Sequence, residues 1–285
     1  MRDLDETSIT DEVLQAISGT PDPRTRQISE ALVRHLHAFI REIEPTQAEW
    51  EMGIDFLTRT GKMCSDVRQE FILLSDTLGV SMLVDAINHR HPEGATETTV
   101  FGPFFVEQRP EYPLGGNISE GVEGKPMYVS GVVRDTAGKP IAHATVDSWH
   151  SDDEGHYDVQ IRDHLAMRGK FRADEKGRFW FWSVRPKFYP IPDDGPVGEM
   201  LRMQGRHPFR PEHVHFMISA QGYETLVTHV FIEGDRYLDS DVVFGVKNSL
   251  ITNYKECQPG IAPDGKQMDR SYLALHYDFV LSAEK

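Results

Sequence analysis

Cysteine is scarce in this sequence: Cys64 and Cys257 are the only two. So few thiols, far apart along the chain, argue against a disulfide framework and a cysteine-based zinc site. The sequence also has no apolar run of membrane-spanning length, and its acidic first residues lack the apolar core of a signal peptide. We therefore expect a cytoplasmic protein with no membrane association.

Basic residues are in deficit. The chain has 30 lysines and arginines against 45 aspartates and glutamates, which gives a formal net charge of -15. Nucleic acids and anionic membranes recruit basic surfaces, so this balance argues against both as partners and favours a small organic substrate. With 285 residues and 39% hydrophobic content, the chain can form one large domain or two modest ones, each with a core.

Several common catalytic motifs are absent: HExxH, GxSxG, a phosphate-binding glycine loop and CxxC. What the sequence does contain is a histidine-rich stretch, residues 205–216, that leads into an alternating pattern. In an extended strand, His213 and His215 share one face, while Val214 and Phe216 share the other. Two imidazoles fixed on a strand can hold a metal ion, although two histidines on a plain sheet surface would give the same pattern.

The chain up to about residue 91 has the periodicity of helices. Apolar residues recur every three or four positions at Ile28, Leu32, Leu36, Phe39 and Ile43, and Pro45 ends this pattern. Thr46 and Glu49 then have the spacing of a capping box for the next helix. We interpret this half of the chain as a helical layer for packing or dimerisation.

A Gly- and Pro-rich segment, residues 102–124, marks a linker, after which the period changes to two. Strands are expected at residues 127–133, 144–149, 179–182, 212–219, 224–232 and 272–281. Short strands with tight turns favour a β-sandwich. The expected fold class is α+β, with an N-terminal helical dimerisation domain and linker over residues 1–105 and a β-sandwich carrying the metal site over residues 106–285.

The oxygen ligands of such a metal are not evident from spacing. Cupin-type ferrous sites also begin with HxH, but they place a glutamate a few residues later, where this chain has Ser219, Ala220 and Gln221. Tyr157 and Tyr189 lie near turns and carry oxygen atoms. Buried tyrosines are more commonly core aromatics whose hydroxyls are hydrogen-bonded, so spacing alone does not select them.

Four ordered motifs carry a family resemblance: Asp147-Ser148-Trp149-His150, Gly155-His156-Tyr157-Asp158, the run from Tyr189 to Pro196, and the run from Arg210 to His215. With them, essentially the whole chain resembles the intradiol ring-cleaving dioxygenases and is most similar to their hydroxyquinol-cleaving branch. The resemblance implies one non-haem Fe(III) per chain, held by Tyr157 and His213 as equatorial ligands and by Tyr189 and His215 as axial ligands. It also implies a homodimer formed through the N-terminal helices.

Tyrosine suits a ferric ion because a phenol with a pKa of about 10 costs about 4 kcal/mol to ionise at neutral pH, which a trivalent cation readily offsets. In the family, Tyr189 would leave the metal and accept a substrate proton, and Arg210 would stabilise charge on the ring. On a straight strand Arg210 would face away from the histidines unless Pro211 bends the chain, and its alternative role is a surface salt bridge. His229 stands where catechol-type relatives commonly have glutamine, and its role is left open.

The resemblance also implies a substrate pocket lined by Leu73, Asp76, Val100, Phe101, Ile191 and Val243. Asp76 is the polar member, and it could accept the third hydroxyl of hydroxyquinol, benzene-1,2,4-triol, or it could cap its helix. The expected reaction opens this triol with O2 to 3-hydroxy-cis,cis-muconate and thence maleylacetate. Catechol or a chlorocatechol is the alternative substrate. A prealbumin-like carrier, suggested by residues 131–140, and a ferrous cupin-like oxygenase are the alternative protein classes.

Overall fold

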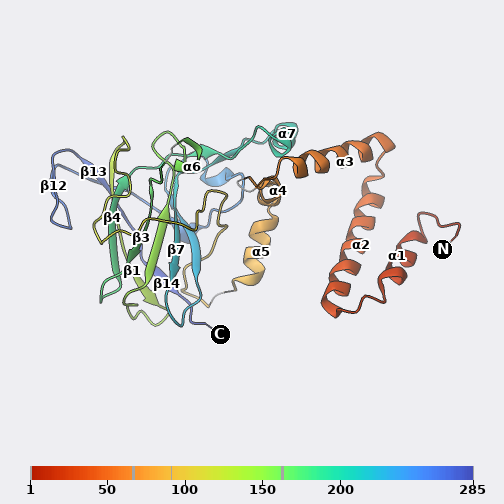
Figure 1. Cartoon of the computed structure of the whole chain (residues 1–285), viewed down its shortest axis with the longest axis horizontal. Coiled ribbons are helices and arrows are strands. Elements are labelled where there is room, and N and C mark those ends of the chain that lie inside the picture. Colours follow the sequence, from red (N-terminus) through yellow and green to blue (C-terminus); the bar gives the residue numbers. More distant parts are fainter. Residues whose placement is uncertain (1, 66–67, 91, 162–163, 285) are drawn as a thin grey trace. The chain divides into compact units, whose positions relative to one another are not determined.

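The computed structural model describes residues 2–65, 68–90, 92–161 and 164–284. By its internal contacts the chain divides into compact units of residues 1–59 and 60–285. The helix-then-sheet order expected from the sequence is confirmed (Figure 1). The fold is therefore α+β.

The first unit is helical, with α1 (Ile9–Ile17), α2 (Pro23–Ile43) and most of α3 (Gln47–Lys62). The Asp22 side chain caps α2 by accepting the Thr25 amide at 2.6 Å, and Pro23 occupies the first turn, where no amide hydrogen is needed. The predicted capping box of α3 is present: the Thr46 amide donates to Glu49 at 2.8 Å, and the Glu49 amide donates to Thr46 Oγ1 at 3.3 Å.

The helices of the first unit leave large apolar side chains exposed, among them Leu32 at 63%, Leu36 at 51% and Phe39 at 53%. Among the described residues, no helix has both the length and the hydropathy needed to cross a bilayer. The exposed apolar side chains lie on amphipathic helices.

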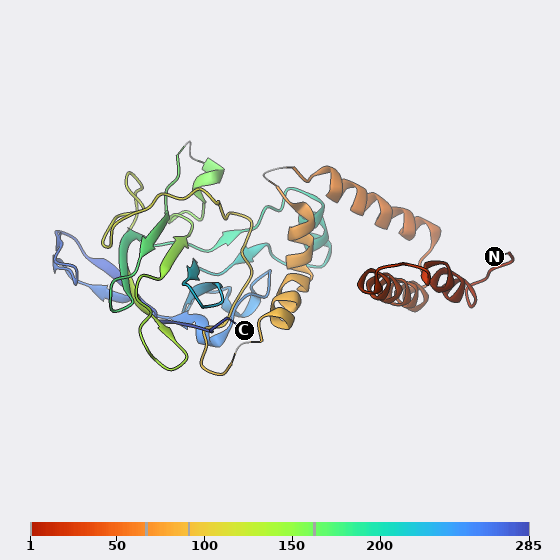
Figure 2. The same ribbon diagram turned by 60° about the horizontal axis from the view of Figure 1, so that its bottom comes forward.

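Helices α4 (Glu70–Thr77) and α5 (Val80–Asn88) belong to the second unit. Leu73 of α4 is buried in one cluster with Val197 and Leu201 of α7 (Pro196–Met203), and the Glu70 carboxylate accepts the Val197 amide at 3.2 Å. Figure 2 shows the orange α4 beside the teal α7. Helix α4 therefore belongs to the second unit. The boundary between the two compact units, after residue 59, comes earlier in the chain than the domain boundary expected after residue 105.

The second unit is built on strands β1 (Pro126–Asp135), β2 (Thr145–Trp149), β3 (Arg168–Arg172), β4 (Arg178–Val184), β7 (His213–Ser219), β8 (Leu226–Ile232), β9 (Ile251–Thr252), β10 (Lys255–Cys257), β13 (Tyr272–His276) and β14 (Phe279–Leu281). One sheet has the order β3-β2-β7-β8-β9, and the other has the order β10-β13-β1-β14 with β4 also paired to β1. Smaller ladders join β5 (Tyr189–Pro190) to β6 (Phe209–Arg210) and β11 (Gly260–Ile261) to β12 (Gln267–Met268). Short helical segments are α6 (Asp158–Ile161), η1 (Leu238–Ser240) and η2 (Asn248–Leu250).

Two differences from the expected strands arise from contacts between segments that are distant in the sequence. The strand expected over residues 272–281 is broken into β13 and β14, because the Tyr277 carbonyl turns toward Gly131 of β1, where a Cβ would lie 1.8 Å from that oxygen. Strand β3 was not predicted, because its sequence, Arg-Gly-Lys-Phe-Arg, is mostly polar. Its pairing with β2 is what makes it a strand.

The main core lies between the two large sheets. One sheet contributes Val129, Phe179, Phe181, Leu273 and Leu275, and the other contributes Val146, Phe171, Val214, Phe216 and Val230. Alternate residues of β7 therefore point into this core, and the intervening residues, His213 and His215, point to the opposite face. That face carries the candidate site.

Candidate metal centre

The two histidines of β7 converge on one point. His213 Nε2 and His215 Nε2 lie 3.1 Å apart, and both side chains are buried. The alternation of β7 directs Val214 and Phe216 into the sandwich core, as predicted from the sequence. Two imidazole nitrogens held this close on a rigid strand could supply two ligands of a metal ion.

Both candidate tyrosines lie beside these histidines. Tyr157 Oη is 2.9 Å from His215 Nε2. The Tyr189 ring lies 5.1 Å from the Tyr157 ring and 5.6 Å from the His213 ring, centroid to centroid. The buried Tyr189 hydroxyl forms no hydrogen bond of good geometry with a described residue, although Tyr157 and Arg210 lie near enough to influence its pKa. The structure thus brings together Tyr157, Tyr189, His213 and His215, which are far apart in the sequence.

A glycine allows the two tyrosine segments to meet. Gly155 has φ +93°, and a Cβ at this position would lie 2.9 Å from the Phe188 carbonyl oxygen and 3.2 Å from Tyr189 Cβ. The turn is closed by Asp152, whose carboxylate accepts the His156 amide at 2.9 Å. Only a residue without a side chain lets the loop that carries Tyr157 lie against the strand that carries Tyr189.

Burial sets the charge state of these groups. Burial raises the pKa of the Tyr157 phenol well above its usual range, and the neighbouring Tyr189 raises it further. Burial also raises the pKa of Tyr189, opposed by the positive charge of Arg210. The pKa values of His213 and His215 are lowered well below the usual range, again mainly by burial. A bound cation would instead lower the pKa values of the two phenols, because it favours the phenolate form.

The orientation of His213 is fixed by its other nitrogen. His213 Nδ1 lies 2.7 Å from the Pro211 carbonyl oxygen. A carbonyl oxygen only accepts, so Nδ1 carries the proton and Nε2 presents its lone pair to the cluster. Metal-binding histidines are commonly oriented in this way. With two phenol oxygens and two imidazole nitrogens, the donor set fits a hard or borderline transition-metal ion.

Arg210 lies inside the site and not on the surface. The β5–β6 ladder pairs Tyr189 with Arg210, and Arg210 Nη1 is 3.5 Å from His213 Nε2. Pro211 and Glu212 separate β6 from β7. Because the strand is interrupted there, Arg210 can lie on the same side as the histidines, which an unbroken strand would not allow. The alternative of a surface salt bridge is wrong, because the arginine is buried.

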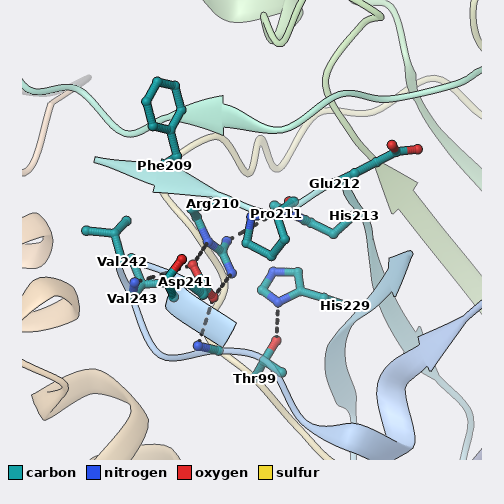
Figure 3. Close-up of polar contacts among 12 residues, drawn as sticks. Thr99, Phe209, Arg210, Pro211, Glu212, His213, His229, Asp241, Val242 and Val243 are labelled. Atoms are coloured by element: carbon teal, nitrogen blue, oxygen red, sulfur yellow. Dashed lines mark hydrogen bonds and ion pairs between the residues drawn. The ribbon is translucent and has the colours of Figure 1, made fainter. Parts of the chain in front are cut away.

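The partner of Arg210 is Asp241, which was not predicted. Arg210 Nε donates to Asp241 Oδ1 at 3.1 Å, and Asp241 also accepts the Gly245 amide at 2.9 Å (Figure 3). Asp241 raises the pKa of Arg210 against the effect of burial, so the guanidinium stays charged. A buried ion pair of this kind holds the guanidinium in one orientation.

The expected pocket residues form two adjoining groups. Leu73, Ile191 and Val243 are buried in one cluster, and Val100 packs against it. Asp76, Val100 and Phe101 line a cavity of ≈ 870 Å³. Asp76 is buried, and burial raises the pKa of its carboxyl group. Val100 belongs to both groups and joins them.

Two further side chains lie at this site: His229, whose role the sequence left open, and Trp149, which the sequence offered only as part of a family motif. The β7–β8 register pairs His215 with His229, and ligand atoms of His213, His215 and His229 lie within 4.8 Å of one another. Trp149, opposite His215 in the β2–β7 register, stacks on its ring at 4.7 Å. The alternating pattern of β8 was the available signal for His229. It shows which residues share a face of the strand, but only the strand register shows that His229 lies opposite His215.

Comparisons with known proteins agree with this geometry. Residues 101–283 match the family model described as Dioxygenase, and residues 22–96 match the one described as Catechol dioxygenase N terminus. The chain is 52% identical to the 6-chlorohydroxyquinol 1,2-dioxygenase of Cupriavidus pinatubonensis over 99% of each chain. It is 50% identical to the hydroxyquinol 1,2-dioxygenase of Rhizobium sp., covering 95% of this chain and 93% of the relative.

A solved structure extends the likeness to three dimensions. The hydroxyquinol 1,2-dioxygenase of Pseudomonas putida DLL-E4 superposes with a TM-score of 0.92 at 50% identity, covering 98% of this chain and 99% of that chain. The similarity therefore includes the helical part as well as the sheets.

Proposed function

The chain belongs to the intradiol ring-cleaving dioxygenases, and from this premise we propose that its substrate is hydroxyquinol. The aromatic ring is opened between two adjacent hydroxylated carbons, and both atoms of O2 enter the product, 3-hydroxy-cis,cis-muconate, which rearranges to maleylacetate. The observation that carries the substrate is the identity of 52% and 50%, over nearly the whole chain, to enzymes named for a chlorinated hydroxyquinol and for hydroxyquinol.

Membership of this family excludes the two alternative protein classes. A prealbumin-like carrier is wrong, because the family is enzymatic. A ferrous cupin-like oxygenase is also wrong, because the match covers residues 101–283 of another dioxygenase family. Catechol and chlorocatechols are retained as competing substrates in the test below.

We propose that Tyr157, Tyr189, His213 and His215 hold one ferric ion per chain. Support comes from the 2.9 Å and 3.1 Å contacts that join Tyr157 and His213 to His215 Nε2. It also comes from the buried hydroxyl of Tyr189, which forms no hydrogen bond of good geometry with a described residue. When bound, the ion supplies positive charge that keeps the phenols and two adjacent substrate hydroxyls ionised, and so leaves the ring electron-rich.

The chain's own residues carry out the remaining chemistry. Held as a phenolate by the ion, Tyr189 would be the base that takes the proton of a substrate hydroxyl and becomes a neutral phenol. The Arg210 guanidinium, held by Asp241 beside His213, stabilises negative charge that develops on the substrate as the ring opens. Fixed charges of this kind are effective where water is excluded.

The pocket walls orient the ring and keep water away. Leu73, Ile191 and Val243 form a buried apolar surface that suits the flat face of an aromatic ring. Asp76 offers a buried polar group for the third hydroxyl, which catechol lacks. A hydroxyl buried without a partner costs about 1–3 kcal/mol, so this pairing favours the triol.

The test compares O2 consumption by the purified protein with hydroxyquinol, 6-chlorohydroxyquinol, catechol and 4-chlorocatechol. A benzenetriol reacts with O2 without an enzyme, so heat-inactivated protein serves as the blank. We expect one iron per chain, a tyrosinate-to-iron absorption band in the visible, and the highest kcat/KM for a triol. A higher kcat/KM for catechol would overturn the substrate assignment.

Iron ligation is tested separately with Tyr157→Phe and Tyr189→Phe proteins. Loss of iron or a shifted visible band supports each assignment. An unchanged iron content with an unchanged band would remove that tyrosine from the set of ligands.

A further inference from the structure

His229 projects from β8 toward the two histidines of the candidate metal centre. Its ring lies 4.2 Å from the His215 ring and 4.8 Å from the His213 ring, centroid to centroid. The side chain is fully buried. One end of the ring is fixed, since Nδ1 lies 2.6 Å from Thr99 Oγ1 (Figure 3). The other end, Nε2, has no hydrogen-bond partner among the described residues.

The partner of each Nδ1 distinguishes His229 from His213. His213 Nδ1 faces the Pro211 carbonyl, which can only accept a hydrogen bond. In the neutral imidazole, the Nε2 of His213 is therefore unprotonated. His229 Nδ1 faces a hydroxyl, which can either donate or accept. The two histidines thus have different constraints on their tautomers, although both direct Nε2 into the same cluster.

The surroundings of Thr99 and of Nε2 together bear on the tautomer. Thr99 is buried, and within the described part of the chain its hydroxyl makes no other hydrogen bond. Each arrangement leaves one buried hydrogen without a protein acceptor: the Thr99 hydroxyl hydrogen if Thr99 accepts from Nδ1, or the Nε2 hydrogen if Thr99 donates to it. An oxygen atom bound in the cluster could accept from Nε2, whereas no described group accepts from Thr99, so donation by Thr99 with the imidazole proton on Nε2 is the arrangement that a bound substrate favours.

Thr99 is itself fixed by the backbone. Its amide donates to the Val227 carbonyl at 3.0 Å, and Thr228 Oγ1 donates to the Glu97 carbonyl at 2.7 Å. These bonds attach residues 97–99 to β8, one residue before Val100 of the pocket wall. The backbone of Thr99 is thus held beside β8, with its hydroxyl within hydrogen-bond distance of His229 Nδ1.

We propose that His229 donates a hydrogen bond from Nε2 to a substrate oxygen held in the cluster, and that Thr99 positions it by fixing this tautomer. An Nε2 that carries a proton has no lone pair for a metal, so His229 is a donor to the substrate and not a further metal ligand. The identity of the acceptor as a substrate oxygen rests on the function proposed above. The tautomer rests on the contacts of Thr99 together with an acceptor for Nε2 in the cluster.

The experiment uses four full-length variants: Thr99→Val, Thr99→Ser, His229→Leu and the double variant Thr99→Val with His229→Leu. Three properties are measured for each: iron per chain with the visible band, the Kd of 4-nitrocatechol under nitrogen, and kcat and KM for hydroxyquinol. The first two do not depend on turnover.

We expect His229→Leu to retain the iron and the visible band while weakening 4-nitrocatechol binding and kcat/KM on the order of tenfold, as for loss of one hydrogen bond to a charged oxygen. Thr99→Val should cause a smaller loss of the same kind, and Thr99→Ser, which keeps the hydroxyl, should restore most of the affinity. Because Thr99 acts through His229, the double variant should be no weaker than His229→Leu alone.

Two results would overturn the inference. Loss of iron from His229→Leu would make His229 a metal ligand. A further loss on adding Thr99→Val to His229→Leu would mean that Thr99 acts on the pocket wall independently. If the wild-type protein fails to open hydroxyquinol, the substrate assignment fails, whereas iron content and 4-nitrocatechol binding still decide the role of His229.

Discussion

Arg210 brings a buried positive charge to within 3.5 Å of a candidate metal ligand. Replacement of Arg210 by Leu should leave iron content and the visible band intact, because the guanidinium is not a metal donor. Turnover should fall on the order of a hundredfold, as for loss of one charge-stabilising donor. Steady-state kinetics and iron analysis of the same preparation measure both effects.

A matched control is Arg202→Leu, since Arg202 is an exposed arginine of the neighbouring α7. It should behave like the wild type. Loss of iron together with activity in Arg210→Leu would instead assign the arginine a structural role.

Asp76 is the residue that we expect to distinguish the triol from catechol. Asp76→Asn preserves the shape of the side chain but weakens the acceptor. It should reduce kcat/KM for hydroxyquinol by roughly tenfold or more, corresponding to about 1–3 kcal/mol, while affecting catechol much less. The ratio of the two kcat/KM values is the measurement, and an unchanged ratio would contradict the role given to Asp76.

His150 links protein stability to pH. Burial lowers the pKa of its imidazole to about 4, and the ring is held between the Ser151 carbonyl at 2.6 Å and Ser183 Oγ at 2.7 Å. The unfolded chain takes up this proton near the ordinary pKa of about 6.5, whereas the folded chain does so only near 4. The stabilisation is therefore complete above pH ~6.5 and is lost as the pH falls toward ~4, a total of about 3 kcal/mol.

Urea unfolding of wild type and His150→Gln at about pH 7 and about pH 5 measures this contribution. The free energy of unfolding should fall less with acidification in the variant than in the wild type. His143→Gln, at a half-exposed histidine, should keep the wild-type dependence. Equal slopes for wild type and His150→Gln would show that His150 is not the linked group.

At the level of secondary structure, Gly131 allows β1 to pair with both β13 and β14. A Cβ here would lie 1.8 Å from the Tyr277 carbonyl oxygen and 2.8 Å from the Phe179 ring. Gly131→Ala should therefore lower the free energy of unfolding by roughly 3 kcal/mol, because the displaced atoms include backbone. Thermal unfolding of the second unit reports the change.

The control for this substitution is Gly61→Ala, whose new Cβ would meet only a Phe71 side-chain atom at 3.6 Å. That variant should unfold near the wild-type temperature. A Gly131→Ala protein as stable as Gly61→Ala would mean that the junction of β13 and β14 adapts without cost.

At the level of the whole molecule, we propose a homodimer formed through the N-terminal helices. Leu36, Phe39, Trp50 and Leu57 line an apolar cavity of ≈ 880 Å³ within the first unit. Exposed apolar surface on this scale is typical of an interaction site, and a second copy of the chain is the partner that the family resemblance implies.

Sedimentation at micromolar concentration should give a dimer for the wild type and a monomer for the pair Leu32→Glu with Leu36→Glu, with iron retained in both. Arg34→Ala, on the same helix, should remain dimeric. A monomeric wild-type protein would contradict the proposal, as would a dimer that persists in the Leu32 and Leu36 variant.

The sequence by itself determined the elements that depend on local chemistry. The helix from Pro23 to Ile43 and the capping box at Thr46 follow from periodicity and capping, which act over a few residues. The face of β7 shared by His213 and His215 follows from the two-residue repeat of a strand. The tyrosines were found through family motifs and not through spacing.

Only the tertiary structure decided which residues distant in the sequence are in contact. The pairing of β3, the break between β13 and β14, the Asp241 partner of Arg210 and the Thr99 partner of His229 all join residues distant in sequence. No local pattern specifies such contacts, because strand register and packing are fixed by the fold as a whole. For the same reason, the sequence leaves the role of His229 open, whereas its neighbour Thr99 assigns it a tautomer.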